Sequence, residues 1–169
     1  ALMSFMGMPY SVLMPYFARD VLHGGPHTLG FLLGAVGIGA LSGTVYLAAR
    51  QGVKGLGRVI AAASAVFGLG LIVFALSTNL ALSLVMLALM GFGLIVQMAS
   101  SNTILQTIVH DDKRGRVMSL YAMALAGMAP FGSLFGGLLS ARIGPPHTLV
   151  ASGIVCIAGA LYCAARCRL

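Results

Sequence analysis

The segment HDDKRGRVMSLY, residues 110–121, separates two long apolar runs and concentrates charge that the rest of the chain lacks. It contains two of the three acidic residues and three of the ten basic ones. The runs on either side, 80–109 and 117–141, contain no acidic or basic residue. Each is longer than the roughly 20 apolar residues that a helix needs to cross a bilayer. The segment therefore predicts a polar connection between two membrane-spanning helices, at which the second of these helices begins.

The composition of the whole chain indicates an integral membrane protein. Hydrophobic residues make up 59% of the sequence and charged residues 8%, whereas a soluble domain carries about 25% charged residues. A net charge of +7 would suggest nucleic-acid binding in a soluble protein. No nucleic-acid-binding motif accompanies it, and the positive-inside bias of membrane loops explains the charge better.

Six apolar segments predict an all-α fold, a bundle of six transmembrane helices. The chain starts in apolar sequence with no basic segment before it. We therefore expect a first helix that is cut at its start, in a chain that is a fragment or a processed piece. The long fourth segment is expected to tilt or to project past the bilayer. The expected helices are 1–18, 29–49, 59–77, 80–109, 117–141 and 147–165.

Basic residues divide unequally between the two sides that this topology creates. Eight of the ten follow the second, fourth and sixth segments, which assigns that side and the C-terminus to the cytoplasm. Only Arg19 and Arg142 fall on the other side. We expect a multi-pass protein of the cytoplasmic (inner) cell membrane. The eight are Arg50, Lys54, Arg58, Lys113, Arg114, Arg116, Arg166 and Arg168.

Small residues predict which helices pack closely. GFLLG (30–34), GALSG (39–43) and GSLFG (132–136) have the spacing that lets helix backbones approach. They favour helix contacts for the second and fifth segments, and the third and sixth, which lack strongly polar residues, suit lipid. LAARQG (47–52) and LSARIG (139–144) end the second and fifth segments on opposite sides. This pair suggests a 3+3 inverted repeat, and coincidence is the alternative.

Polar side chains gather in QMASSNTILQ, residues 97–106. Gln97 and Ser101 are four residues apart, as are Asn102 and Gln106, so each pair shares a helix face. These groups either line a substrate cavity or form hydrogen bonds between helices, with Asn102 and Gln106 better placed for packing or a gate. Tyr10 is a second cavity candidate, in a segment that two prolines bend.

The charged segment also poses an electrostatic question. Asp111 or Asp112 suits the N-cap of the following helix, where the dipole favours negative charge. Arg114 and Arg116 oppose that dipole and need another partner. Lipid headgroups, the two aspartates and an absent domain are the alternatives. Gly115 would allow a close neighbour, which favours a specific contact.

No expected helix contains a central acidic or basic residue. A carboxylate for proton coupling must therefore be supplied from elsewhere, because such groups inside membrane helices usually mark function. His23, His27 and His147 lie in predicted loops without the partner ligands of a metal site. We expect no cofactor, no metal site and no enzymatic activity.

The run NTILQTIVHDDKRGRVMSLYAMALAGMAPFGSLFGG, residues 102–137, resembles the tenth and eleventh helices of major facilitator superfamily transporters. The resemblance is to the branch of enterobactin and macrolide exporters, and the Arg-Gly-Arg-Val-Met-Ser block is its most specific part. PYSVLMPYFARDVLHGG, residues 9–25, similarly looks like the seventh helix and its outer loop. In ARQGVKGLGR, residues 49–58, the superfamily's Asp-Arg loop signature lacks its acid.

The resemblance implies the C-terminal half, helices seven to twelve, of a transporter that works by alternating access. Its partner would be the N-terminal six-helix half, or a second copy of the chain. The gradient of a proton or another ion would drive the whole protein, and the substrate would be a small amphipathic compound, drug- or siderophore-like. Residues 111–116 would form part of the cytoplasmic gate against the other half. A membrane module that scaffolds or regulates a partner without transport is the alternative.

Overall fold

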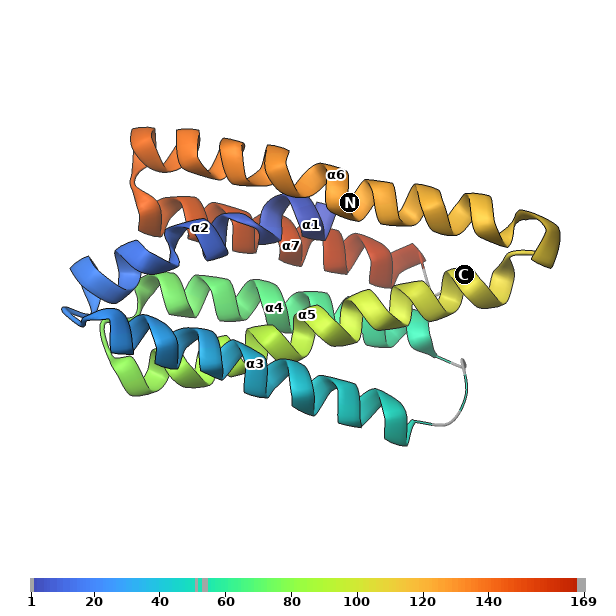
Figure 1. The fold of residues 1–169 in the computed structure, drawn as a ribbon, viewed down its shortest axis with the longest axis horizontal. Coiled ribbons are helices and arrows are strands. Elements are labelled where there is room, and N and C mark those ends of the chain that lie inside the picture. Colours follow the sequence, from blue (N-terminus) through green and yellow to red (C-terminus); the bar gives the residue numbers. More distant parts are fainter. Residues whose placement is uncertain (1, 51, 53–54, 167–169) are drawn as a thin grey trace.

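The computed structural model describes residues 2–50, 52 and 55–166, and within them the chain is helical with no strand. The helices run back and forth along one long axis (Figure 1). They are α1 Leu2–Gly7, α2 Pro9–Tyr16, the π-helix η1 Phe17–Val21, α3 Pro26–Ala49, α4 Leu56–Leu76, α5 Leu80–Ile108, α6 Asp111–Ile143 and α7 Pro145–Arg166.

The first predicted helix, 1–18, is divided into three pieces, in a segment that its two prolines were expected to bend. Pro9 has no N–H to donate to the carbonyl of Phe5, so α1 ends at Gly7 and α2 starts afresh. Pro15 lies inside α2, and directly after it the chain widens into η1, where Leu22 N donates to Phe17 O at 2.9 Å. The missing N–H of Pro9 thus explains the break between α1 and α2.

Five described helices, α3 to α7, are long and apolar enough to cross a membrane. The first predicted segment is not among them, because none of its three pieces is long enough by itself, so a sixth span stays a prediction. The other predicted boundaries agree within about three residues, except that α6 starts at Asp111 rather than at 117. The charged segment forms the first turns of this 33-residue helix, in agreement with the prediction that a helix begins there.

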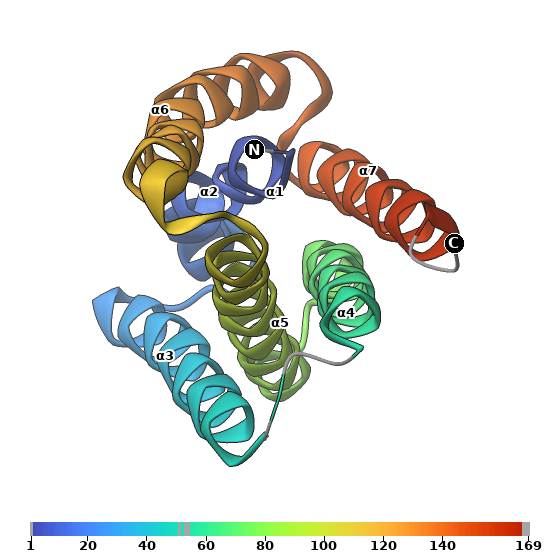
Figure 2. The same ribbon diagram turned by 90° about the vertical axis from the view of Figure 1, so that its right-hand side faces the viewer.

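The core of the bundle lies around α4, which packs between α5 and α7 (Figure 2). Phe67 and Phe74 of α4 are fully buried, and the ring of Phe17 lies 4.9 Å from that of Phe74. Within an apolar stretch of 18 residues in each helix, half of the residues of α4 are buried, against 17% in α3 and 11% in α6. One face of the third segment is thus packed in the core, and lipid contact of its other face stays a prediction. The interior of a membrane bundle is as apolar as lipid, so a lack of polar residues does not identify a lipid-facing helix.

Glycines let α3 and α5 approach to backbone contact. A Cβ atom on Gly39 would overlap the carbonyl oxygen of Ala88, and one on Gly43 would lie 3.0 Å from that of Phe92. Gly91 of α5 meets the backbone of Val36 in the same way. Gly43 lies one turn after Gly39, and its neighbour Phe92 lies one turn after Ala88. The two helices therefore run parallel. The GALSG motif therefore packs as the sequence predicts.

The GSLFG motif of α6 makes a matching contact with α1 and α2. A Cβ on Gly132 would overlap the carbonyl of Phe5, the group that Pro9 leaves without its helical partner, and Gly136 lies against the Pro9 ring. This pair of helices also runs parallel. The GFLLG motif of α3 behaves differently, because a Cβ on either of its glycines would meet no atom within 4 Å.

The helices α4 and α7 cross at two glycines that face each other. A Cβ on Gly68 would lie 2.8 Å from the carbonyl oxygen of Gly153, and one on Gly153 would lie 2.7 Å from that of Gly68. Gly68 also lies against Ile157, four residues beyond Gly153, and Gly153 lies against Ile72, four residues beyond Gly68. The crossing is antiparallel, and each side of the contact mirrors the other.

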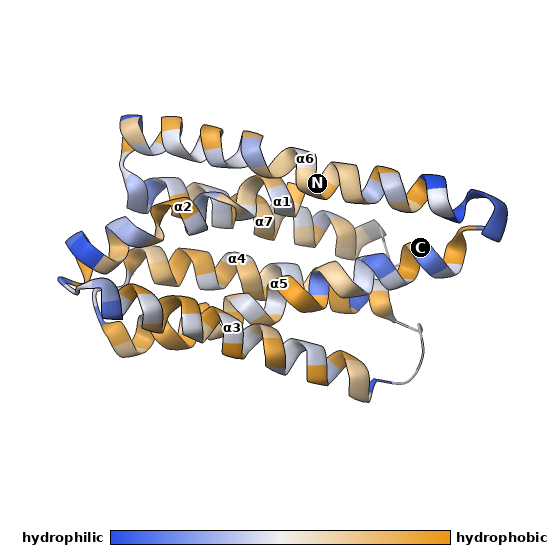
Figure 3. Ribbon diagram, in the orientation of Figure 1, coloured by the Kyte–Doolittle hydropathy of each residue, from blue (hydrophilic) through white to orange (hydrophobic). Residues whose placement is uncertain are grey.

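Charged residues lie at the two ends of the bundle and leave its middle apolar (Figure 3). Arg19 and Arg142 lie at the end where α3 begins. Lys54 and Arg168, and part of the ARQGVKGLGR segment, lie outside the described residues. The end that holds the α3–α4 and α5–α6 connections carries Arg50, Arg58, Lys113, Arg114 and Arg116.

Candidate functional site

A cavity of about 450 Å³ lies between α1, α5 and α6, and we call it the Gln97 cavity. Its walls are methionine, alanine, glycine and leucine side chains with a few polar groups. Thioethers adapt to ligands of different outline, so the walls suit an apolar compound of moderate size. The lining residues are Met3, Ser4, Gly7, Met8, Tyr10, Leu94, Gln97, Met98, Ala122, Leu125, Ala126 and Ala129.

Three polar side chains contribute to the cavity. Gln97 Nε2 donates to Ser101 Oγ at 3.4 Å along α5, and Gln97 Oε1 is buried without a hydrogen-bond partner among the described residues. Ser4 Oγ donates to the carbonyl of Leu125 at 2.6 Å and so ties α1 to α6. The ring of Tyr10 stands edge-on to a buried phenylalanine of α4, with centroids 6.2 Å apart.

The sequence-predicted cavity residues separate into two groups. Tyr10 and Gln97 lie in the cavity wall, whereas Ser101, Asn102 and Gln106 do not line it. Gln106 Nε2 donates to Asn102 Oδ1 at 3.0 Å, so both four-residue pairs bond within α5 rather than to a neighbouring helix. A role of any of these five in substrate binding or gating stays a prediction.

Tyr121 is a residue that sequence reasoning missed. Its hydroxyl donates to the carbonyl of Met98 across the gap between α6 and α5 at 3.1 Å, one helical turn from the alanine-lined wall. The spacing of Tyr121 from the cavity residues Ala122 and Leu125 was visible in the sequence. The partner was not, because it depends on how two helices lie side by side.

We expect Tyr121→Phe to loosen α6 from α5 without unfolding the chain. A hydrogen bond of this kind contributes ~0.6–1.5 kcal/mol, and the free energy of unfolding in mixed detergent micelles should fall by that amount. Tyr16→Phe is the matched control, because Tyr16 is exposed and its ring packs on Phe17. If the two variants had the same free energy of unfolding, the Tyr121–Met98 hydrogen bond would not contribute to stability as proposed.

The predicted gate lies at the start of α6. The N-cap residue is His110, whose side chain makes no capping bond, and Asp111 and Asp112 occupy the first turn. The prediction of an aspartate at the N-cap is therefore wrong by one position. The carboxylates still lie where the helix dipole favours negative charge.

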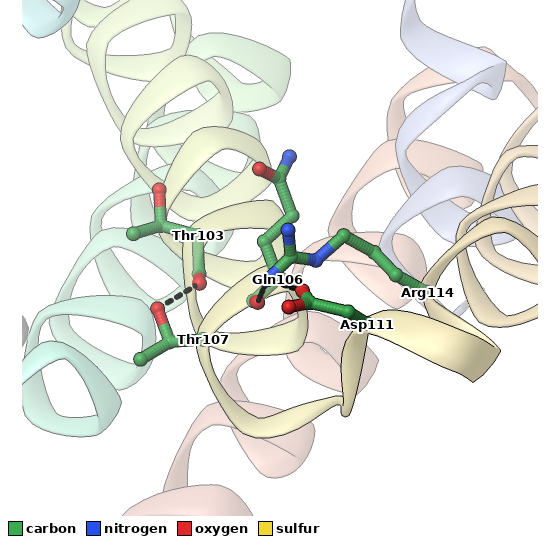
Figure 4. A network of polar contacts seen from close by, with 5 residues as sticks. All are labelled: Thr103, Gln106, Thr107, Asp111 and Arg114. Carbon is green, nitrogen blue, oxygen red and sulfur yellow. Dashed lines mark hydrogen bonds and ion pairs between the residues drawn. The ribbon is translucent and has the colours of Figure 1, made fainter.

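Arg114 finds its partners within the chain (Figure 4). Its Nη2 lies 2.8 Å from Asp111 Oδ1 and donates to the main-chain carbonyl of Gln106 at 3.3 Å. That carbonyl belongs to the last turn of α5, where a cation is favourable. Of the alternatives for Arg114, the structure thus shows an aspartate together with a helix end. The pair is exposed, which limits its contribution to ~0.2–1 kcal/mol.

Arg116 and Gly115 are placed differently from Arg114. Both are exposed, and a Cβ on Gly115 would meet no atom within 4 Å. Within the described residues, the only ion pair between a base and an acid joins Arg114 and Asp111. The close neighbour expected for Gly115 is therefore not found among the described residues.

The geometry of the site is that of a binding wall with a charged turn at one end. No group of three histidine, cysteine or acidic side chains that could hold a metal occurs within the described ranges. The cavity offers apolar surface and a few hydrogen-bonding groups.

Comparison with known proteins agrees with this geometry. Residues 3–169 match the family model of major facilitator transmembrane secretion effectors. No curated protein matches the sequence at a significant level. Because the family match covers nearly the whole chain, the protein belongs to the transmembrane secretion effectors of the major facilitator superfamily, a family of multi-pass membrane transporters.

Proposed function

We propose that this chain is the C-terminal half of a secondary transporter that exports a small amphipathic compound by alternating access. The Gln97 cavity carries the proposal, because an apolar space with a few polar side chains in its wall is suited to such a compound. The family match supports transport in general, and the resemblance to drug and siderophore exporters supports the compound class.

The partner in this proposal is an N-terminal six-helix half. Large apolar side chains are exposed on α3 and α6. In an apolar stretch of 18 residues, only 17% of the residues of α3 and 11% of those of α6 are buried. Gly30 and Gly34 supply a small-residue face on α3 that nothing in the described part of the chain contacts. Such a face lets a second helix approach closely, so α3 and α6 are the helices that would pack on the other half.

The contacts between helices support an inverted repeat within this half. The parallel packing of α3 on α5 through Gly39 and Gly43 has a counterpart in α6 on α1 and α2 through Gly132 and Gly136. The mirrored α4–α7 crossing would then lie on the axis that relates the two groups of three helices. This arrangement is the one expected of transporter halves.

The coupling ion and the orientation are also proposed. All three acidic residues lie near helix ends, so the proton or other ion that drives transport would be carried by groups outside this chain. The more basic end would face the cytoplasm, in the inner cell membrane, and the C-terminus would lie on that side. The segment from Asp111 to Arg116 would then meet the other half at the cytoplasmic gate.

The gate proposal predicts a defect in transport without a defect in insertion. Arg114→Gln together with Arg116→Gln, in a transporter that contains both halves, should slow export of the dye N-phenyl-1-naphthylamine roughly tenfold. Loss of one charge-assisted hydrogen bond of ~1.5 kcal/mol across the interface would have that effect. Dye fluorescence in loaded cells measures export, and membrane fractionation measures insertion.

Arg142→Gln is the control for this experiment, because Arg142 is exposed at the opposite end of α6. It should export the dye at the rate of the unmodified protein. Unimpaired export by the double variant would leave Arg114 with its bonds to Asp111 and the Gln106 carbonyl and Arg116 with lipid anchoring, and the gate proposal would be withdrawn.

A further inference from the structure

A groove of about 330 Å³ lies between α4 and α7 at the more basic end of the bundle, and we call it the alanine groove. Five of its seven lining residues are alanine, so short side chains leave the space open. Ala61 and Ala160 are buried and form its floor, whereas Ala62 and Leu161 are exposed at its rim. A molecule outside the chain can therefore reach the groove.

The way in which α4 and α7 cross explains where the groove lies. The backbones of the two helices touch at Gly68 and Gly153, and helices that cross at an angle separate on either side of their contact. Ala61 and Ala160 each lie seven residues from the contact, toward the more basic end. Methyl groups are too short to fill the space between the helices at that level.

The depth of the groove matches that of the acyl chains in a bilayer. Gly68 lies near the middle of α4, Leu56–Leu76, and Arg58 lies ten residues before it at the end of the groove. A rise of 1.5 Å per residue places Arg58 roughly 15 Å from the middle of α4, which is about half of the ~30 Å hydrocarbon core. Arg58 would therefore lie at the level of the lipid phosphates, with the groove below it.

The charge at the end of the groove indicates the kind of lipid. Arg58 is exposed, and within the described ranges no hydrogen bond or ion pair engages its side chain. Neither α4 nor α7 has an acidic residue. Arg114, by contrast, is paired with Asp111. A guanidinium group binds phosphate oxygens well, so the groove joins an apolar channel to a group that attracts an anion.

We propose that the alanine groove binds one acyl chain of a phospholipid with an anionic headgroup, whose phosphate pairs with Arg58. The proposed packing of the other half on α3 and α6 leaves this side of α4 and α7 to the lipid. Only the assignment to the cytoplasmic leaflet, whose surface is negatively charged, rests on the proposed function through its orientation. The binding itself does not depend on transport.

The test is competition between phosphatidylglycerol and phosphatidylcholine with the same acyl chains, added in equal amounts to the full chain in detergent micelles. Native mass spectrometry measures the ratio of chains that carry one phosphatidylglycerol to chains that carry one phosphatidylcholine. The unmodified chain should favour phosphatidylglycerol roughly fivefold. Arg58→Gln should bring the ratio close to one, and Arg58→Lys should retain most of the preference. Arg114→Gln removes the same charge from a side chain that is already paired, and should leave the ratio unchanged.

A second pair of variants tests the groove itself. Ala62→Phe fills the groove from its exposed rim and should reduce binding of phosphatidylglycerol several-fold, whereas Ala158→Phe, at an exposed position of α7 outside the groove, should not. An unchanged ratio in Arg58→Gln, or unchanged binding in Ala62→Phe, would overturn the proposal. Displacement of the lipid by glycerol 3-phosphate would overturn it in favour of an anion site without the groove, and a dimer that Ala62→Phe dissociates would assign the groove to a second copy. Export by the two-half protein tests the proposed function separately.

Discussion

Gly39→Val should prevent α3 from packing on α5 and thereby destabilise the whole chain. A Cβ at this position overlaps the carbonyl oxygen of Ala88, a backbone atom that cannot turn aside as a side chain can. Overpacking against movable side chains costs ~1–3 kcal/mol, and we expect the upper end of that range or more. Thermal unfolding in detergent micelles should show the transition shifted down or lost, with aggregation on purification.

Gly37→Val is a closely matched control for this prediction. Gly37 lies two residues away on the same helix and is exposed, and a Cβ there would meet no atom within 4 Å. The same substitution at Gly37 should leave unfolding unchanged. Equal behaviour of the two variants would show that α3 and α5 do not meet at Gly39, and the packing scheme would fail with it.

The sequence predicted the long helices well because their ends carry local signals. Pro26, Gly55 and Gly144 lie at or next to helix boundaries, and Asn79 accepts from Ala81 N at 2.9 Å as an N-cap. The broken first segment was only half predicted. Its two prolines predicted a bend, but the π-helix that follows Pro15 depends on how the later residues pack.

The packing of helix faces was predicted less well. Spacing identified Gly39 and Gly132 as contact residues, because a helix face is a local property. Spacing gave no means to distinguish them from Gly30 and Gly34, which have the same pattern but no neighbour among the described residues. Only the position of another helix separates the two cases.

The residues of the candidate site also differ in whether the sequence alone could identify them. Gln97 and Tyr10 were found by polarity, which is unusual in an apolar helix and visible without a structure. Tyr121 was missed, because its partner is a main-chain carbonyl on another helix. For Arg114, the dipole argument correctly required a partner, but the carbonyl of Gln106 becomes available only once α5 and α6 meet at a tight turn.

Transport should disappear when this chain is separated from the other half. Alternating access requires two bodies that rock about a site between them. In the proposed function this chain supplies one of them, and large apolar side chains are exposed on its helices α3 and α6. We expect no export above the leak through protein-free liposomes by the chain alone, and export on addition of an N-terminal half. Cross-linking establishes whether the chain is a monomer, which separates this outcome from transport by a homodimer.

The most direct measurement is therefore export of N-phenyl-1-naphthylamine from liposomes that contain this chain with and without an N-terminal half, under an imposed proton gradient. The account predicts gradient-dependent export only when both halves are present. Gradient-dependent export by the monomeric chain alone would contradict the half-transporter account, and absence of export with both halves would favour a membrane module without transport activity.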